Sequence, residues 1–284
     1  MSDNKKVIKV TYPLISNAGD ALNKPLIEHF SGAEVVKSKA YESDMIAIGG
    51  GLSNLQYGSG FVKRTAQAVL GATAGAKPIY VWGSGFIFGA KVGEFYRKNI
   101  QIRALRGELS RRKASGIMKK NIDVPLCDAG LLIDALYPVA PKKEYRLGII
   151  SHYLEKDMPC FKKLYDDNAD SLIIDITDSA EKVLENISKC EVLISSSLHG
   201  LIFADSVGVP NLHLKVTDRL MGDGFKFKDY YSSFGLEHNC WDLDKTSELP
   251  TIRNVIDSYQ ISEDAVNKKK IEMINAFPEE LKFI

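Results

Sequence analysis

The sequence of 284 residues lacks the features that mark several special classes of protein. It has four cysteines, which are widely spaced and form no CxxC pair, so we predict neither a zinc site nor a disulfide framework. No apolar run reaches the roughly 20 residues that span a bilayer. The N-terminal stretch MSDNKKVIKV has no apolar run of signal-peptide length. We therefore expect a cytoplasmic protein with free thiols.

Charge of one sign is also missing. Lysine and arginine number 37 and aspartate and glutamate 36, so the formal net charge is +1. A protein without a basic excess has no general electrostatic attraction to nucleic acid, and we expect none as a partner. The hydrophobic content of 45% is ordinary for a globular domain and allows a substantial core.

Several catalytic signatures are absent as well. The sequence contains no HExxH, no GxSxG elbow and no Walker loop. His29, His152, His213 and His238 share no ligand spacing with each other or with a cysteine, so we expect no metal site.

Short strands rich in β-branched residues alternate with helical patterns along the chain, and the alternation restarts after the proline- and lysine-containing stretch Pro138–Lys143. This pattern predicts an α/β fold with two Rossmann-like, doubly wound domains facing a cleft. We place the N-terminal domain at residues 1–140 and the C-terminal domain at 141–260. A terminal helix at 261–284, opened by Ser262, is expected to pack back on the first domain.

Polar and glycine residues follow the predicted strands of the first domain. Because ligands of such sheets bind beyond the carboxyl ends of the strands, these residues are candidates for contact with a hydroxyl-rich ligand. Helix capping by Asp20 or Asn17 and tight turns at the glycines are the competing interpretations. The candidates for binding an acceptor are Asn17, Asp20, Gly50, Gly51, Asn54, Gly83 and Ser84.

The stretch from Cys190 to Pro210 predicts a strand, a loop, a helix and another strand. Its loop carries Ser195-Ser196-Ser197-Leu198-His199-Gly200 directly before the helix. A helix start offers unpaired N–H groups and a positive dipole end, which together bind anions. We expect these residues to bind a ligand with a phosphoryl or carboxylate group and His199 to act as a general acid. The competing interpretations are a serine N-cap and a structural histidine.

Cations for that ligand come from outside the loop. Arg106 lies at a strand-to-helix turn, and Arg219 and Lys226 lie in a glycine-containing stretch after the last predicted strand of the second domain. Arginine suits bidentate contact with phosphate or carboxylate, and lysine suits a point contact. A solvated loop is the competing interpretation for Arg219 and Lys226.

Together these motifs resemble the polysaccharide pyruvyl transferase family, and the resemblance extends over nearly the whole chain. The residues that carry it are Asn17–Asp20, Ile48–Gly51, Trp82–Gly85, Arg106–Ser110, Ser195–Gly200 and Gly208–Pro210. The segment Phe225–Tyr231 looks like the bacterial exopolysaccharide branch of that family.

The resemblance implies a GT-B-like fold and a transferase that moves the enolpyruvyl group of phosphoenolpyruvate onto two hydroxyls of a sugar, forming a pyruvate ketal. It also implies that His199 acts as the acid and that arginines hold the donor. Some members carry arginine where this chain has Ser197. We expect Arg106, Arg219 or Lys226 to meet the donor's charge instead.

The expected acceptor is a lipid-linked oligosaccharide in surface-polysaccharide assembly. Such an acceptor implies peripheral contact with the inner face of the cell membrane, for which the basic clusters at Arg111–Lys113 and Lys119–Lys120 are candidates. No step requires a cofactor, and a homo-oligomer is left open. The alternatives are a GT-B glycosyltransferase with a nucleotide-sugar donor and a non-catalytic protein that binds sugar or nucleotide.

Overall fold

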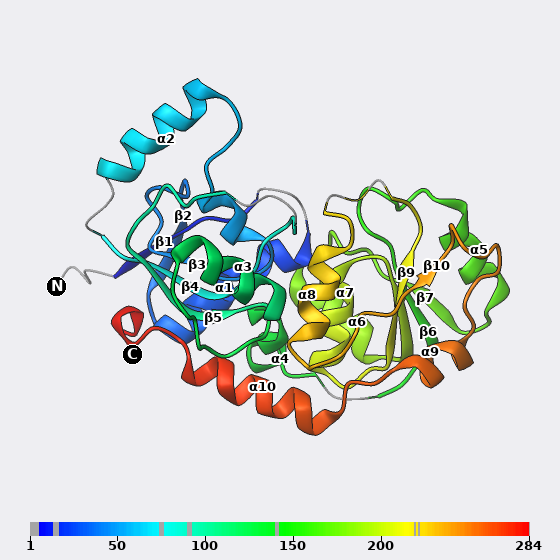
Figure 1. The fold of residues 1–284 in the computed structure, drawn as a ribbon. Helices are drawn as coiled ribbons and strands as arrows, with labels where there is room; N and C mark the ends of the chain where they lie inside the picture. Colours follow the sequence, from blue (N-terminus) through cyan, green and yellow to red (C-terminus); the bar gives the residue numbers. More distant parts are fainter. Residues whose placement is uncertain are drawn as a thin grey trace.

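The chain folds around two parallel five-stranded sheets, which lie side by side in Figure 1. The computed structural model describes residues 6–13, 17–73, 77–89, 93–139, 142–218, 220 and 222–283. All the strand pairings of the two sheets are parallel. We call the parts built around the first and the second sheet the first half and the second half.

The first half contains β1 (Val7–Val10), α1 (Ala18–Ser31), β2 (Glu34–Lys37), β3 (Met45–Ile46), η1 (Gly51–Leu55), α2 (Phe61–Thr73), β4 (Ile79–Ser84), β5 (Ile100–Leu105), α3 (Glu108–Met118), η2 (Ala129–Leu132) and α4 (Ile133–Leu136). The rest of the chain contains β6 (Tyr145–Ile150), α5 (Pro159–Asp167), β7 (Ser171–Ile173), α6 (Ala180–Ser188), β8 (Cys190–Ser195), α7 (Leu198–Ser206), β9 (Asn211–Lys215), α8 (Phe225–Ser232), β10 (Trp241–Asp242), α9 (Ile252–Ser258), α10 (Glu263–Asn275) and η3 (Glu279–Leu281).

Both sheets have the same topology. The first has the order β2-β1-β3-β4-β5 and the second, read from its other edge, β7-β6-β8-β9-β10. Each is the doubly wound order 2-1-3-4-5, in which the chain reverses direction across the sheet beside its first strand. The two reversal points lie between β1 and β3 and between β6 and β8. The expected fold class, two doubly wound α/β units in a GT-B-like arrangement, is confirmed.

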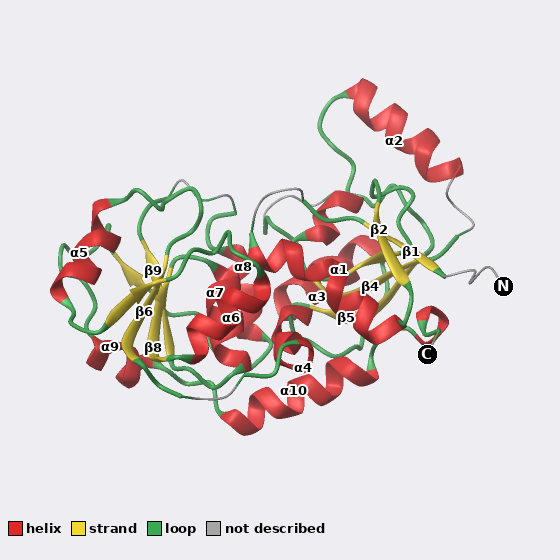
Figure 2. Cartoon of the chain, turned by 180° about the vertical axis from the view of Figure 1, so that it is seen from behind, coloured by secondary structure: helices red, strands yellow, loops and turns green. Residues whose placement is uncertain are grey.

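The two halves share one hydrophobic core. A single cluster of buried side chains includes Ile8 and Trp82 from the first sheet, Leu193 from the second, and residues of α1, α6 and α7 between them. Figures 1 and 2 show these helices in the middle of the molecule. Separate clusters cover the outer faces of the two sheets. The sheets are therefore joined by an apolar layer rather than by a linker alone.

Helix α10 fastens the halves together along one edge of the molecule (Figure 1). The indole N–H of Trp82, in the first sheet, donates to the carbonyl of Met273 in α10 at 2.8 Å. Lys270, also in α10, contacts Asp134 of the first half and the carbonyl of Ser206 of the second, each at 2.6 Å. The backbone N–H of Phe283 then donates to Ser31 at 2.7 Å, so the C-terminal segment returns to the first half.

Helix starts follow local sequence signals. The side chain of Asn17 accepts from Gly19 N, that of Ser179 from Lys182 N, and that of Ser262 from Ala265 N. The caps expected at Asn17 and Ser262 are confirmed. The short strand β10 was not predicted, because two residues carry no periodicity; it is held by pairing with β9.

Candidate active site

A cleft of about 200 Å³ lies where the two reversal points face each other. Its walls come from the loops that follow β1, β3, β6 and β8, together with the start of α8 and Arg106 after β5. These loops meet because the carboxyl ends of parallel strands share one edge of each sheet. The predicted residues that line the cleft are Asn17, Asp20, Gly50, Gly51, Asn54, Arg106, Ser197, Leu198, His199 and Lys226.

His199 stands in the first turn of α7 and projects across to the first half. An added Cβ at Gly19 would overlap its imidazole ring, and one at Gly49 would lie 3.6 Å from its Cε1. Glycine at these two positions therefore lets α1 and the triple-glycine loop contact the ring directly. Gly49 also has a φ of +77°, which glycine adopts without strain.

The Nε2 atom of His199 is buried and has no hydrogen-bond partner among the described residues. A buried polar atom without a partner costs about 1–3 kcal/mol, so this nitrogen is suited to receive a ligand. Burial, followed by the charges of Lys226 and Arg106, lowers the pKa of His199 to about 3. The ring is thus neutral at pH 7 until an anion enters the cleft.

The two described cations of the cleft differ in how they are held. Arg106 is fully buried: its Nε donates to Asp229 of α8 at 2.9 Å and its Nη2 to the carbonyl of Phe86 at 2.6 Å. Asp229 thus neutralises most of its charge. Lys226 forms no hydrogen bond or ion pair with the described residues, and burial lowers its pKa to about 8. Lys226 is therefore the cation most available to an anion. Arg219 lies outside the described residues.

Two carboxyl groups of the first half have raised pKa values. Burial raises the pKa of Asp20, which lines the cleft, to about 6. No donor among the described residues contacts its carboxylate. Burial also raises the pKa of Asp128 to about 6, although its carboxylate accepts from the backbone N–H groups of Gly49 and Gly130. Asp20 is poised to exchange a proton near neutral pH, and Asp128 fixes the glycine loop.

Other predicted residues lie behind the cleft and hold its loops. Ser195 Oγ donates to the carbonyl of Ser197 and accepts from its N–H, each at 3.0 Å, and packs against Gly200. Ser84 Oγ donates to the carbonyl of Gly49 at 3.0 Å. Gly83 packs against Ala129. The structure does not place Ser195, Ser196, Gly200, Gly83 or Ser84 among the residues that line the cleft.

His152 lines the cleft and was not predicted as a site residue. It follows β6, and its backbone N–H donates to Ser196 Oγ at 2.8 Å. Burial lowers its pKa to about 4. The signal that would have found it is the matching strand order, since the loop after β6 corresponds to the one after β1.

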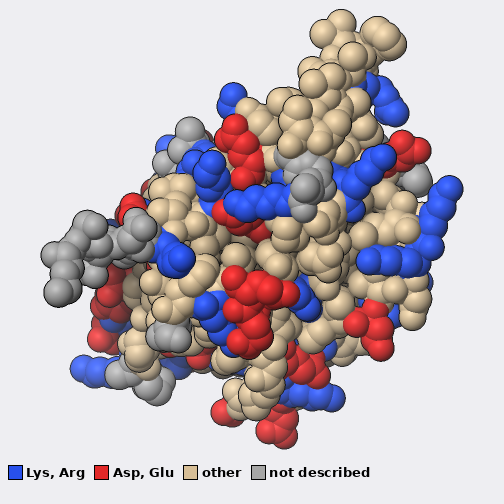
Figure 3. All heavy atoms as spheres, turned by 90° about the vertical axis from the view of Figure 1, so that its left-hand side faces the viewer, with Lys and Arg blue, Asp and Glu red and all other residues tan. Residues whose placement is uncertain are grey.

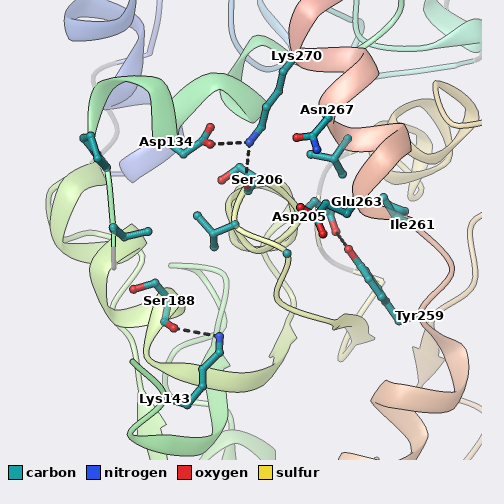
Figure 4. A pocket seen from close by; sticks show the side chains of 15 residues that line it. Asp134, Lys143, Ser188, Asp205, Ser206, Tyr259, Ile261, Glu263, Asn267 and Lys270 are labelled. Carbon is teal, nitrogen blue, oxygen red and sulfur yellow. Dashed lines mark hydrogen bonds and ion pairs between the residues drawn. The ribbon is translucent and has the colours of Figure 1, made fainter. Parts of the chain in front are cut away.

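A larger cavity, of about 590 Å³, lies at the other end of α7 (Figure 4). Most of its charged groups are paired with protein atoms, whereas Glu263 has no partner among the described residues and Asp134 Oδ1 is buried without one. Lys270 contacts Asp134 and Ser206, and Lys143 donates to the carbonyls of Ser188 and Cys190. Asp205 accepts three hydrogen bonds, at 2.6 Å from Asn211 Nδ2, 2.8 Å from Tyr230 OH and 3.0 Å from Tyr259 OH. The larger cavity thus leaves fewer charged side chains free to bind a ligand than the cleft does.

The fold and cleft define a class of doubly wound α/β protein with a polar site between two facing sheet edges. Within that class, the family model for polysaccharide pyruvyl transferase matches residues 3–218. The chain belongs to this family of transferases, as the sequence motifs predicted.

Two further proteins are similar to the chain. An uncharacterized protein of Acanthamoeba polyphaga mimivirus is 29% identical over 174 residues, which are 59% of this chain and 59% of that protein. The chain thus matches about three fifths of that relative's length. A crystal structure of an alpha1,3-fucosyltransferase aligns over 96% of this chain and 83% of its own, with 9% identity and a TM-score of 0.32. At that score the likeness carries no argument about the site.

Proposed function

We propose that the protein transfers the enolpyruvyl group of phosphoenolpyruvate onto two hydroxyls of a sugar, forming a pyruvate ketal in surface-polysaccharide synthesis. The observation that carries the proposal is the buried, unpartnered Nε2 of His199, which lies in a cleft beside the unpaired Lys226. The family assignment supports the same chemistry.

The donor would bind at the start of α7. Phosphoenolpyruvate carries a phosphate and a carboxylate, and the first N–H groups of a helix together with a lysine match such charges. Ser197 at the N-cap of α7 makes no capping hydrogen bond, so its hydroxyl is available as well. Lys226 would take the role of the arginine that some members of the family carry at the position of Ser197.

Proton transfer would then follow the charge of the bound donor. Its phosphate raises the pKa of His199, which takes up a proton and gives it to the methylene carbon. The resulting oxocarbenium-like C2 is attacked by the first sugar hydroxyl, whose proton passes to Asp20. The bond from C2 to the phosphate oxygen breaks, the second hydroxyl attacks C2, and its proton leaves with the phosphate.

The two halves would divide the work. We propose that residues 1–140 form the acceptor side, with Asn17, Asp20 and Asn54 near the sugar, and that residues 141–260 form the donor side. The terminal segment 261–284 would hold the two together. The start of α8 belongs by sequence to the second half, but its Asp229 is anchored on Arg106 and Ser110 of the first.

A lipid-linked acceptor would require contact with a membrane surface. Arg111 and Arg112 pair with Glu108, so the basic cluster at 111–113 offers less free charge than its sequence suggests. Helix α2 is a better surface, because Phe61 and Val62 are 85% and 81% exposed beside Lys63 and Arg64. Figure 3 shows α2 as a projection, mostly of uncharged side chains, at the top of the molecule.

Sedimentation with anionic lipid vesicles tests this contact. We expect the wild-type protein to pellet with vesicles and a variant carrying Phe61→Asp and Val62→Asp to stay in the supernatant. Equal pelleting of the two would remove α2 from the proposal. Among the described residues, no helix is both long and apolar enough to cross a bilayer.

Phosphate release is the test of the reaction itself. We would incubate the protein with phosphoenolpyruvate and a panel of lipid-linked and free oligosaccharides, and in parallel with nucleotide-sugars. We expect phosphate release that depends on a sugar acceptor. The sugar should also gain the mass of pyruvic acid less one water, as a ketal requires. Sugar transfer from a nucleotide donor would replace the proposal with a glycosyltransferase. Binding of sugar or nucleotide without turnover, unaffected by loss of His199, would replace it with a non-catalytic protein.

A further inference from the structure

Two histidines and a cysteine gather beside the second sheet, away from the cleft. His213 lies on β9, and His238 and Cys240 lie on the segment that leads into β10. Their ligating atoms all lie within 4.8 Å of one another. The sequence predicted no metal site here, because 25 residues separate the two histidines and spacing rules reach only close neighbours.

We infer that His213, His238 and Cys240 bind a zinc ion. Two imidazole nitrogens and a thiolate are the ligand types that zinc prefers, and three protein ligands leave a fourth position for water. The three residues line a cavity of about 400 Å³, which gives that water room. The inference rests on this geometry and is independent of the proposed reaction.

The arrangement needs little movement to hold the ion. His213 Nδ1 and His238 Nε2 are 2.9 Å apart. Zinc–nitrogen bonds of about 2.0–2.1 Å at a tetrahedral angle place two nitrogens about 3.3 Å apart. The imidazoles would therefore separate by about 0.4 Å, and the hydrogen bond between them would be replaced by two bonds to zinc. Cys240 is half-buried on a loop and can turn toward the ion.

The surroundings hold the ring of His213 in place, and two of the three lysines beside the cluster are paired with aspartates. His213 is buried and stacks on Phe227, with ring centroids 3.7 Å apart and planes 16° apart. Lys215 pairs with Asp218 and Asp242, and Lys245 pairs with Asp242. Lys228 also lines the cavity and makes no ion pair with the described residues.

The ion would position α8 rather than take part in the reaction. Phe227, which carries the stacked contact with His213, directly follows Lys226 of the cleft. The ring of His238 also contacts Phe227, with ring centroids 5.5 Å apart. A zinc ion that fixes His213 and His238 would therefore fix both of the rings that contact Phe227. Zinc would thus stabilise the start of α8.

Metal content measured on the full chain tests the inference. The protein is stripped with a chelator, equilibrated with zinc chloride, passed through a desalting column and analysed for zinc. We expect one zinc per chain in the wild type and in the control Cys160→Ser, which removes a half-buried cysteine of α5. Cys240→Ser and His238→Gln each remove a direct ligand and should lower the affinity for zinc by at least about 100-fold. Loss of a group that only supports a ligand already costs about 10–100-fold.

Three readouts separate loss of the site from loss of the fold. Circular dichroism reports whether each variant is folded. In the wild type itself, zinc should slow alkylation of Cys240 and leave that of Cys160 unchanged, as followed by peptide mass spectrometry. Cobalt in place of zinc should give a thiolate charge-transfer band that Cys240→Ser abolishes. A wild-type chain that holds no zinc, or folded Cys240→Ser and His238→Gln variants that hold it as tightly as the wild type, would overturn the inference.

Discussion

Helix α7 has a cavity at each end, and the two cavities differ in how many of their polar groups have hydrogen-bond partners. At its start, His199 Nε2 is buried without a partner, and the ammonium of Lys226 and the carboxylate of Asp20 make no hydrogen bond with the described residues. At its end, Asp205 accepts three hydrogen bonds and the carbonyl of Ser206 accepts one from Lys270. The helix itself is buried along its whole length, so the same element serves both cavities.

The difference separates function from structure better than cavity size does. A paired buried group contributes about 1 kcal/mol to stability, whereas an unpaired one costs about 1–3 kcal/mol. Proteins retain such costs mainly where a ligand supplies the missing partner. We therefore expect substitutions at the start of α7 to reduce turnover and spare stability, and substitutions at its end to do the reverse.

The largest effect is expected from His199→Gln. A positioned acid contributes about 10²–10⁴-fold, so phosphate release should fall by that factor while the urea midpoint stays unchanged. Ser206→Ala is the matched control on the same helix, because its hydroxyl only donates to the carbonyl of Phe203 at 2.7 Å. Near wild-type turnover in His199→Gln would refute the role of this residue.

Next in size is the loss of Asp205. Asp205→Ala leaves the hydroxyls of Tyr230 and Tyr259 and the amide of Asn211 without their acceptor, which should cost about 3 kcal/mol of unfolding free energy in urea titration. Tyr259→Phe removes one of the three donors and should cost about 1 kcal/mol. Turnover per folded molecule should stay unchanged in both. A large loss of turnover in either variant would mean that the two ends are not separable.

A smaller effect is expected from Lys226→Met. A hydrogen bond to a charged group is worth about 1.5–3 kcal/mol, so the Kd for phosphoenolpyruvate should rise about 30-fold in calorimetric titration. Stability should change little, since the lysine makes no hydrogen bond or ion pair with the described residues and only lies over the Phe227 ring, 5.2 Å from its centroid. Lys228→Met, two residues along α8 and exposed, is the control. Equal Kd values for the wild type and Lys226→Met would shift the donor site elsewhere.

The smallest and most specific effect concerns pH. Asp20 and Asp205 both have pKa values raised from 3.8 to about 6, so the folded state binds protons more tightly than the unfolded state between these values. Each carboxyl therefore contributes less stability as pH rises from about 4 to about 6.

The stability of the wild type minus that of Asp20→Asn, or of Asp205→Asn, should fall over this pH range in thermal unfolding. Only Asp20→Asn should also change the pH profile of turnover. The same change of profile in Asp205→Asn would contradict the comparison, as would a difference in stability that rises with pH.

The sequence predicted the helices and strands well, but it did not predict which side chains bind one another. Periodicity and caps are local, so the helices that begin near Asn17 and Ser262 and the alternation of strands and helices in both halves were predicted. The loop with His199 was also found, because a strand followed by a polar loop and a helix predicts a ligand site in any parallel sheet.

Long-range pairings escaped the sequence. Arg106 looked like a free donor ligand, but 123 residues further along the chain Asp229 binds its guanidinium. The serines before His199 looked equivalent, yet Ser196 holds His152 and Ser195 closes its own turn. Which side chains meet depends on how the two sheets face each other, and no local pattern records that relation.

The apolar layer between the sheets limits how substrates can enter. Rotating one half against the other would expose side chains of α1, α6 and α7, at about 25 cal/mol for each Å² of apolar surface. Strapping by α10 and the anchoring of Asp229 oppose the same rotation. We therefore expect the cleft to keep a nearly fixed width when substrates bind, without closure of one half onto the other. In such a cleft the acceptor is selected by the shape of the rim, and water is displaced by the sugar itself.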